Sequence, residues 1–474
     1  MTKNLKMTEN TNLRTLNECE QEVVPERHYG FCTDCKQPKT YYDWCKNCSR
    51  RGFEHDFNKW TSGNKYIDKF IQETQQKARC EPEVIEWIPY NKLRNIKYLT
   101  KGGFSTIYRA IWLDAIDKPG WGNEFQICNQ DSGHLHRLNE NDYEIAKEKD
   151  VKSPLNKNEV KGRRVILKSL NDSSNINDDF LNEWRNCLRC INSAYESDTY
   201  LITRIFGITQ DPETSNYMIV MKSINRGNLR SNLLVKKYNQ FEKYRNLMGI
   251  AISLLTLHKC NLVHGDFHSG NILLNSRDTN YLSDFGLSRP VNQTINSNEI
   301  FGVIPYMAPE ILRGKPYTKA ADIYSFGIIM WEFTSGIPAF NDRSHDFDLS
   351  LDICRGLRPK IVEGTLPVYV RLMKRCWDSD PNKRPTTDEL VEILSCWYDY
   401  YPKPGLHDRI PVPINEPTTK SHPSSCYTSR KIDYSAKLDG ILNQEELSSK
   451  FVIDEERNYN NEPILSESLE NCKI

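Results

Sequence analysis

Hydrophobic positions change their spacing along the chain, and each spacing predicts a different element. Ile67, Phe70 and Ile71 recur at helical spacing in the stretch NKWTSGNKYIDKFIQETQQ, which predicts a short helix within residues 58–90. Buried strands are predicted for the runs RRVILKSL and SNYMIVMKS, which are rich in apolar residues. A long apolar helix is predicted for LMGIAISLLTLHKC, and this helix leads into the polar loop HGDFHSGN.

A glycine pair lies between two strand-like runs in LTKGGFSTIYRAIW, residues 99–112. The pattern predicts a glycine-rich hairpin, although such a pair is more often an ordinary turn than a cover for phosphates. The strand RRVILKSL carries Lys168, and the helical pattern INDDFLNEWRNCLRC carries Glu183. Each residue type is usually solvated, but together they offer an ion pair beside a glycine loop.

Polar residues in the loop HGDFHSGN place Asp266 and Asn271 after the long helix. The segments NILL and YLSDFGLS follow as two short strands around a turn, and the second carries Asp284. We expect these three oxygen-bearing side chains to converge.

Four cysteines are paired in CTDCKQPKTYYDWCKNC, Cys32 with Cys35 and Cys45 with Cys48. Four thiolates from two CxxC turns satisfy a tetrahedral, structural Zn²⁺. Four unrelated surface thiols are the alternative, which the paired spacing disfavours. A module over residues 27–57 is too small to bury a core, so the metal would hold it together. Its basic residues admit nucleic-acid contact, but a solvated surface explains them more simply.

The chain of 474 residues has 63 Lys plus Arg and 63 Asp plus Glu, so its overall charge favours neither nucleic-acid nor membrane partners. No run approaches the roughly eighteen apolar residues of a membrane span. The N-terminal stretch MTKNLKMTENTNLRTLNE lacks the apolar centre of a signal peptide. We therefore expect a cytoplasmic protein whose 15 cysteines are reduced thiols or metal ligands.

Short motifs follow one another in a fixed order from residue 91 onwards, namely GGFSTI, VILK, NE, HGDxxxxN, DFG, YMAPE, DIYSFG and RPT. In this order they resemble a eukaryotic-type protein kinase domain of the tyrosine-kinase-like branch over residues 91–401. The combination with a zinc-knuckle segment is similar to chains of expanded fungal kinase sets. The resemblance implies an α+β, bilobal kinase fold with a small antiparallel-sheet lobe and a large helical lobe.

Segments around this domain are expected to be less regular. Residues 1–26 and 402–474 are expected to be flexible, with one short helix over ILNQEELSSKFVI in the tail. Residues 58–90 would link the zinc module to the kinase domain. Residues 117–162 form a long polar stretch between two small-lobe strands and are expected to be a mobile insertion.

The resemblance also implies roles for matched residues. Asp266 would accept the proton of the acceptor hydroxyl, and Asn271 and Asp284 would bind Mg²⁺. Lys168 would hold the phosphates of ATP, fixed in place by Glu183. The rest of the ATP site would come from the glycine loop and the hinge after SNYMIVMKS, namely Leu99, Gly102, Gly103, Ile107, Met221, Lys222, Ser223 and Ile224.

Other matched positions would support the site or depart from the family pattern. Glu310 and Arg384 would form a buried ion pair, and Asp322 would brace the loop that holds Asp266. Gly265 stands where the family usually has arginine. Ile166 stands where the family usually has alanine against the adenine ring.

The implied function is ATP-dependent phosphorylation of Ser or Thr hydroxyls in protein substrates, within intracellular signalling. His268 and Gly270 match neither the Ser/Thr nor the Tyr signature that follows Asp266 in the family, so a tyrosine or dual-specificity kinase is an alternative. A pseudokinase scaffold, whose fold and zinc module only bind protein partners, is the other alternative.

Overall fold

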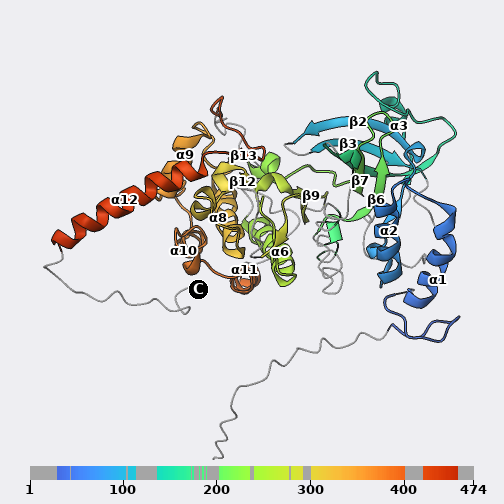
Figure 1. The fold of residues 1–474 in the computed structure, drawn as a ribbon, viewed down its shortest axis with the longest axis horizontal. Helices are drawn as coiled ribbons and strands as arrows, with labels where there is room; N and C mark the ends of the chain where they lie inside the picture. The colour runs from blue at the N-terminus through green and yellow to red at the C-terminus, as the bar shows by residue number, and fades with distance from the viewer. Residues whose placement is uncertain are drawn as a thin grey trace, which may run out of the picture.

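Two lobes form the body of the computed structural model, a sheet-rich small lobe and a helical large lobe (Figure 1). The structure describes residues 29–42, 44–102, 105–113, 136–171, 173–175, 181, 184–185, 188, 190, 202–234, 240–276, 279–291, 300–400 and 420–456. No helix in these ranges is long and apolar enough to cross a membrane.

A seven-stranded sheet forms the small lobe, and its strands run in the order β1-β6-β7-β5-β3-β2, with β4 paired to β5. All neighbouring strands are antiparallel except β1 and β6, which are parallel. The strands are β1 (Glu86–Trp87), β2 (Leu93–Lys101), β3 (Ser105–Trp112), β4 (His136–Arg137), β5 (Lys161–Leu170), β6 (Ile205–Gln210) and β7 (Tyr217–Lys222).

The interval 58–90 does more than link two modules. The predicted helix is present as α2 (Lys65–Lys77), and it is followed by β1, which pairs with β6. Gly207 of β6 has no room for a side chain, because a Cβ there would meet the carbonyl oxygen of Glu86. Through β1, residues 58–90 therefore contribute to the small-lobe sheet. A strand of two residues is too short to leave a pattern in the sequence that predicts it.

Helix α2 buries one face against the rest of the small lobe. Ile67, Phe70 and Ile71 are each fully buried. The ring of Phe70 lies edge-on to that of Trp184, with centroids 6.4 Å apart, and the guanidinium of Arg185 lies 5.6 Å from the Phe70 centroid. The apolar stripe predicted from the sequence is therefore the face that packs on the segment around Trp184.

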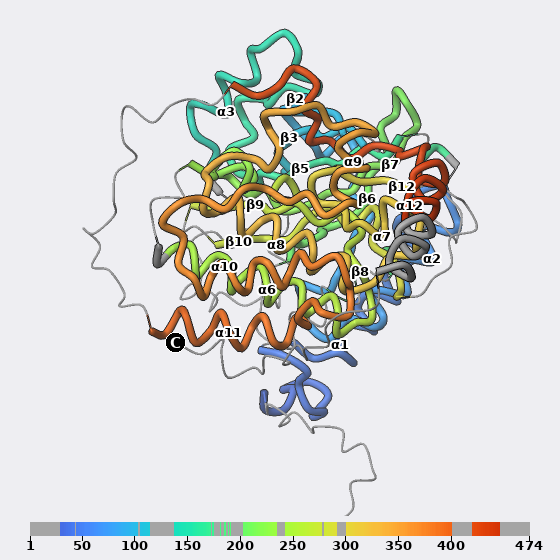
Figure 2. The backbone as a smooth tube through the Cα atoms, turned by 90° about the vertical axis from the view of Figure 1, so that its left-hand side faces the viewer, coloured from blue at the N-terminus to red at the C-terminus, as the bar shows by residue number. Residues whose placement is uncertain are grey.

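Helices make up the large lobe, and α8 runs through its centre with every residue from Ala321 to Thr334 buried. Figure 2 shows α11 lying alongside α6. The helices are α6 (Gln240–Lys259), α7 (Pro309–Leu312), α8 (Lys319–Ser335), α9 (Phe347–Cys354), α10 (Pro367–Cys376) and α11 (Thr387–Tyr400). Two-stranded ladders join β8 (Leu262–Val263) to β11 (Arg289–Pro290) and β9 (Ile272–Leu274) to β10 (Asn280–Leu282).

The described part of the polar insertion is more regular than the sequence predicts. Residues 136–162 contain β4 and the short helix α3 (Glu140–Ile145). Asn139 and Asp142 form a reciprocal capping box at the start of α3. Leu138 and Leu155 are buried, which ties this segment to the sheet. The expected mobile insertion is therefore corrected over this range.

The tail is also ordered where the structure describes it, over residues 420–456. Strand β13 (Arg430–Ile432) pairs antiparallel with β12 (Ile300–Gly302), and α12 (Ser435–Glu456) follows on the large lobe (Figure 1). Ile432, Leu438 and Leu442 are buried in the core cluster of the large lobe. The expectation of a flexible tail is therefore corrected here, whereas the short helix expected within it is present as part of α12.

We predict that Phe70→Ala lowers the free energy of unfolding by about 3–5 kcal/mol, because it leaves a cavity between α2 and Trp184. Chemical denaturation followed by tryptophan fluorescence measures this change. Lys69→Ala, on the exposed face of the same helix, is the control and should stay within about 0.5 kcal/mol of wild type. A loss below about 1 kcal/mol for Phe70→Ala would mean that α2 does not stabilise the small lobe.

Candidate active site

The loop between β8 and β9 is held from below by a carboxylate of α8. Asp322 is 2% exposed and accepts hydrogen bonds from the backbone N–H groups of His264 and Gly265, at 2.9 and 3.2 Å. The Nε2 atom of His258 lies 2.9 Å from the same carboxylate. The predicted brace beneath the loop is confirmed, and it fixes the backbone immediately before Asp266.

Gly265 occupies a backbone conformation that few side chains tolerate. Its φ is +76°, and a Cβ there would lie 2.7 Å from the carbonyl oxygen of Leu287. An arginine at this position would be strained and would also displace the neighbouring segment. The local backbone conformation therefore favours glycine at position 265 over the arginine that is usual in the family.

Asp266 and Asn271 lie together, as predicted. The amide Nδ2 of Asn271 donates to the backbone oxygen of Asp266 at 2.9 Å and lies 3.5 Å from its carboxylate. The backbone oxygen of Asn271 in turn accepts bonds from the N–H and hydroxyl of Ser283, at 2.9 and 2.8 Å. Because Ser283 precedes Asp284, these bonds hold the three candidate residues in one place.

Lys168 of β5 and Asp284 form an ion pair across the two lobes. Burial by itself would raise the pKa of Asp284, but the nearby Lys168 ammonium holds this pKa below its ordinary value. Asp284 has a φ of +60°, which turns its carboxylate toward Lys168 and the N–H of Gly286. Glu183, the expected partner of Lys168, lies outside the described residues.

The residues expected to contact adenine and the phosphates lie on or just after four neighbouring strands of the small-lobe sheet, β2, β3, β5 and β7. Ile107 of β3 is paired with Lys168 of β5, and Ile166 of β5 is paired with Met221 of β7. The chain then continues from Lys222 into Ser223 and Ile224. Leu99 is exposed on β2, and the N–H of Gly102 donates to the oxygen of Ser105 at 2.8 Å. Gly103 lies outside the described residues.

One expected ion pair and one unexpected contact support this site. Arg384 donates to both carboxylate oxygens of Glu310, at 2.6 and 2.8 Å, so the predicted buried pair is confirmed. Arg230 was not singled out from the sequence, yet its Nη2 donates to Nδ1 of His268 at 3.0 Å. No local sequence pattern predicts this contact, because Arg230 lies after β7 whereas His268 lies in the loop after β8.

A chain of buried hydroxyls continues from the loop into α8. The hydroxyl of Ser269 lies 2.9 Å from that of Tyr306, which donates to Glu332 at 2.5 Å. Burial raises the pKa of Glu332 to about 7. The sequence analysis assigned no role to these three residues, although Ser269 lies in the loop HGDFHSGN and Tyr306 begins the motif YMAPE.

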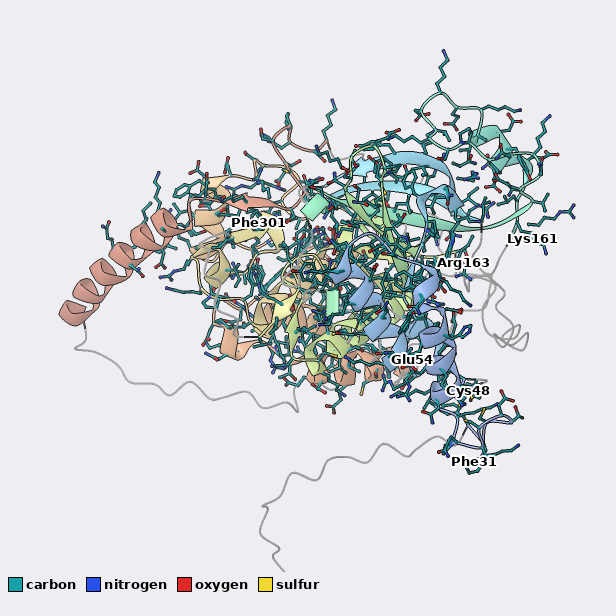
Figure 3. All side chains as sticks on the ribbon, turned by 45° about the vertical axis from the view of Figure 1, so that its right-hand side comes forward. Phe31, Cys48, Glu54, Lys161, Arg163 and Phe301 are labelled. Carbon is teal, nitrogen blue, oxygen red and sulfur yellow. The ribbon has the colours of Figure 1, made fainter. Side chains whose placement is uncertain are left out.

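The four paired cysteines converge at the other end of the molecule, where Figure 3 labels Phe31 and Cys48 far from Phe301. Their sulfur atoms all lie within 4.8 Å of one another. Cys32 and Cys48 are 3.7 Å apart, and Cys35 and Cys45 are 3.4 Å apart. Tetrahedral zinc with bonds of about 2.3 Å needs sulfurs roughly 3.8 Å apart, so the cluster has the geometry for zinc.

Local structure explains why these sulfurs meet. Cys45 caps helix α1 (Lys46–Asp56), which places Cys48 in its first turn. Cys32 lies in a tight turn. Its N–H donates to the carbonyl oxygen of Gln37, and its carbonyl oxygen accepts from the N–H of Lys36. Backbone N–H groups of Cys35 and Asp34 lower the pKa of the Cys32 thiol to about 7, which favours the thiolate that a metal requires.

The cluster is tied to helix α2 rather than suspended on a linker. Thr40 donates to the backbone oxygen of Arg79 at 2.7 Å, and the indole of Trp44 donates to that of Ala78 at 3.4 Å. Trp44, Ala78 and Val84 are buried together, with Phe53 of α1 packed against them. The four cysteines therefore have a fixed connection to the small lobe.

Comparison with known proteins agrees with this geometry. A family model described as protein tyrosine and serine/threonine kinase matches residues 146–394, more than half of the chain, so the chain belongs to this family of protein kinases. The family match confirms the predicted kinase resemblance and bilobal α+β fold, and it implies ATP and Mg²⁺ as cofactors and proteins as substrates.

Several curated proteins are similar over the kinase domain. The serine/threonine/tyrosine-protein kinase HT1 of Arabidopsis thaliana is 29% identical over 52% of this chain and 66% of its own length. The serine/threonine-protein kinase STY17 of the same plant is 29% identical over 38% of this chain and 32% of its own length. The probable serine/threonine-protein kinase roco8 of Dictyostelium discoideum is 36% identical over 38% of this chain and 10% of its own length. The chain thus spans less than two thirds of each of these relatives.

Proposed function

We propose that this chain is an ATP-dependent protein kinase that phosphorylates Ser or Thr hydroxyls of protein substrates. The observation that carries the proposal is the convergence of Asp266, Asn271 and Asp284 at the ion pair with Lys168. Phosphoryl transfer requires positioning and charge neutralisation more than covalent chemistry, and these four side chains supply both. Relatives named as serine/threonine kinases support the choice of acceptor.

The donor atoms fit a divalent cation. Because Nδ2 of Asn271 is turned to Asp266, its Oδ1 is left to face a metal beside the carboxylate of Asp284. Asn271 and Asp284 would hold Mg²⁺, which would supply positive charge to neutralise the phosphates of ATP. Lys168 would then exchange its carboxylate partner for the phosphates, with Glu183 as its second anchor.

Asp266 would receive the proton of the acceptor hydroxyl. Its side chain is largely buried and held by Asn271, so it has a defined orientation toward an incoming group. Adenine would lie between the glycine hairpin and the end of β7, next to Leu99, Ile107 and the backbone after Met221. The remaining proposed contacts are those of Gly102, Gly103, Lys222, Ser223 and Ile224.

Four thiolates at Cys32, Cys35, Cys45 and Cys48 would hold one structural Zn²⁺, and the geometry of their sulfurs supports this assignment. The domain division that follows is a zinc module over 27–57 and a kinase domain over 91–401, to which 58–90 adds α2 and β1. A protein partner of the zinc module is part of the same proposal.

Asp266→Asn is predicted to reduce phosphorylation of a generic protein substrate by at least about a hundredfold, because the amide cannot accept the proton. A steady-state assay with ATP and Mg²⁺ measures this loss. Asp348→Asn, in the exposed first turn of α9, is the control and should keep wild-type turnover. A wild-type chain without turnover on Ser/Thr or Tyr acceptors would instead favour the scaffold.

Ile166→Ala is predicted to tighten ATP binding about 5–150-fold, because the branched side chain at the register of Met221 intrudes on the adenine space. Calorimetric titration with ATP and Mg²⁺ measures the change in Kd. Ile166→Val keeps the branch and should bind nearly as wild type does. Equal affinities for all three chains would show that the adenine space already accommodates isoleucine.

One zinc ion per chain is predicted for protein purified without chelator, and Cys35→Ser should lose most of it. A structural site of this kind contributes apparent binding energies of about 10–16 kcal/mol, so its loss should unfold the module. Elemental analysis gives the zinc content, and proteolysis between residues 29 and 63 reports unfolding. Cys396→Ser, at an exposed cysteine of α11, is the control. A metal-free wild-type chain that resists proteolysis there would contradict the assignment.

A further inference from the structure

Strand β13 of the tail follows the edge of the activation segment, the stretch between Asp284 and Glu310. Its pairing with β12 is antiparallel, and the last matched pair is Gly302 with Arg430. Continuing this register by one position brings Ser429 level with Val303. The tail therefore crosses the activation segment at one defined place (Figure 1).

This place borders the candidate base. Gly302 and Val303 line one small cavity together with Gly265, Asp266 and Phe267. Because β13 pairs with β12, the tail runs beside Gly302, one of the residues that line this cavity.

Ser429 carries the hydroxyl of the tail at this place in the register. Its Oγ is buried and has no hydrogen-bond partner within the described residues. The neighbouring Thr428 is exposed, and its hydroxyl lies 3.2 Å from the sulfur of Cys426. An unpaired buried hydroxyl is costly, and within the described residues no other group competes for this one.

A second contact ties the same segment to the catalytic loop. Arg230 donates through Nη1 to the backbone oxygen of Tyr427 at 2.8 Å, and through Nη2 to Nδ1 of His268 at 3.0 Å. The other ring nitrogen of His268 lies 3.5 Å from the carboxylate of Asp266. One guanidinium thus fixes the tail two residues before Ser429 and the loop two residues after the base.

The following residues keep the tail on the large lobe. Arg313 of the large lobe donates to Asp439 of α12 at 2.7 Å, and the hydroxyls of Ser350 and Tyr434 are 2.9 Å apart. Because these anchors belong to the same chain, Ser429 stays at a high effective concentration beside the activation segment. A free acceptor would have to displace it.

We propose that Ser429 is a phosphorylation site, modified in cis by the active site of the same chain. The proposal rests on the proposed kinase function. The Ser429 oxygen forms a bond to the γ-phosphorus of ATP as the bond from that phosphorus to the β–γ bridging oxygen breaks. ADP leaves with the electron pair of that bond, and the hydroxyl proton passes to Asp266.

The test uses the full chain, first dephosphorylated and then incubated with ATP and Mg²⁺. Mass spectrometry should find phosphate on Ser429, and the rate constant should not change with protein concentration, as expected for a reaction within one chain. Ser429→Ala should reduce phosphate on the peptide covering 426–432 to background. Thr428→Ala is the matched control and should leave Ser429 phosphorylation unchanged.

A mixing experiment separates reaction in cis from reaction in trans. An Asp266→Asn chain mixed with an active Ser429→Ala chain should remain unphosphorylated at Ser429. Phosphate appearing there at the wild-type rate overturns the cis assignment. Absence of phosphate on Ser429 in a chain that phosphorylates an added protein substrate overturns the proposal and leaves the kinase function standing. Absence of transfer to every acceptor overturns both.

Discussion

The buried carboxylate of Asp322 is the contact on which the rest of the site depends. It lies on α8, whose residues are enclosed from Ala321 to Thr334, so it cannot move without repacking the large lobe. Each hydrogen bond to a charged group contributes about 1.5–3 kcal/mol, and Asp322 binds two consecutive backbone N–H groups before Asp266. The loop is thereby positioned by the core of the lobe and not by its own sequence alone.

The ion pair between Lys168 and Asp284 joins the small lobe to this anchored loop. The Lys168 side chain is 9% exposed and that of Asp284 is 41% exposed, so the buried ammonium is the charge that most needs its partner when no ligand is present. Phosphates would replace the carboxylate beside Lys168, and a metal would replace the ammonium beside Asp284. Lys168 and Asp284 would each have an opposite charge nearby both with and without ligands. Ligand binding would therefore leave neither charge uncompensated.

Short motifs with fixed spacing were sufficient to predict the loop of Asp266 and Asn271, and the pair of Glu310 with Arg384. Their geometry depends on local turns and on one fold shared by the whole family. Contacts made by short segments at long range were not predicted. Strand β1 has two residues, and its partner β6 lies far along the chain, so no periodicity marks it. The tail was expected to be flexible because the contacts of Ile432 and Leu438 become visible only in the folded lobe.

Control of the site depends on Gly265 and on what surrounds the activation segment. Arginine cannot replace this glycine without strain, so the usual partner for a phosphate on that segment is missing. Ser288, near the start of the segment, is buried with its hydroxyl bonded to the oxygen of His264, and is therefore a poor acceptor. In the described part of the activation segment, the pairing of β13 with β12 adds a contact from the tail to the Glu310–Arg384 ion pair, which ties the segment to the large lobe. Neither contact needs a phosphate, so both hold the segment without the arginine that the family usually has at position 265.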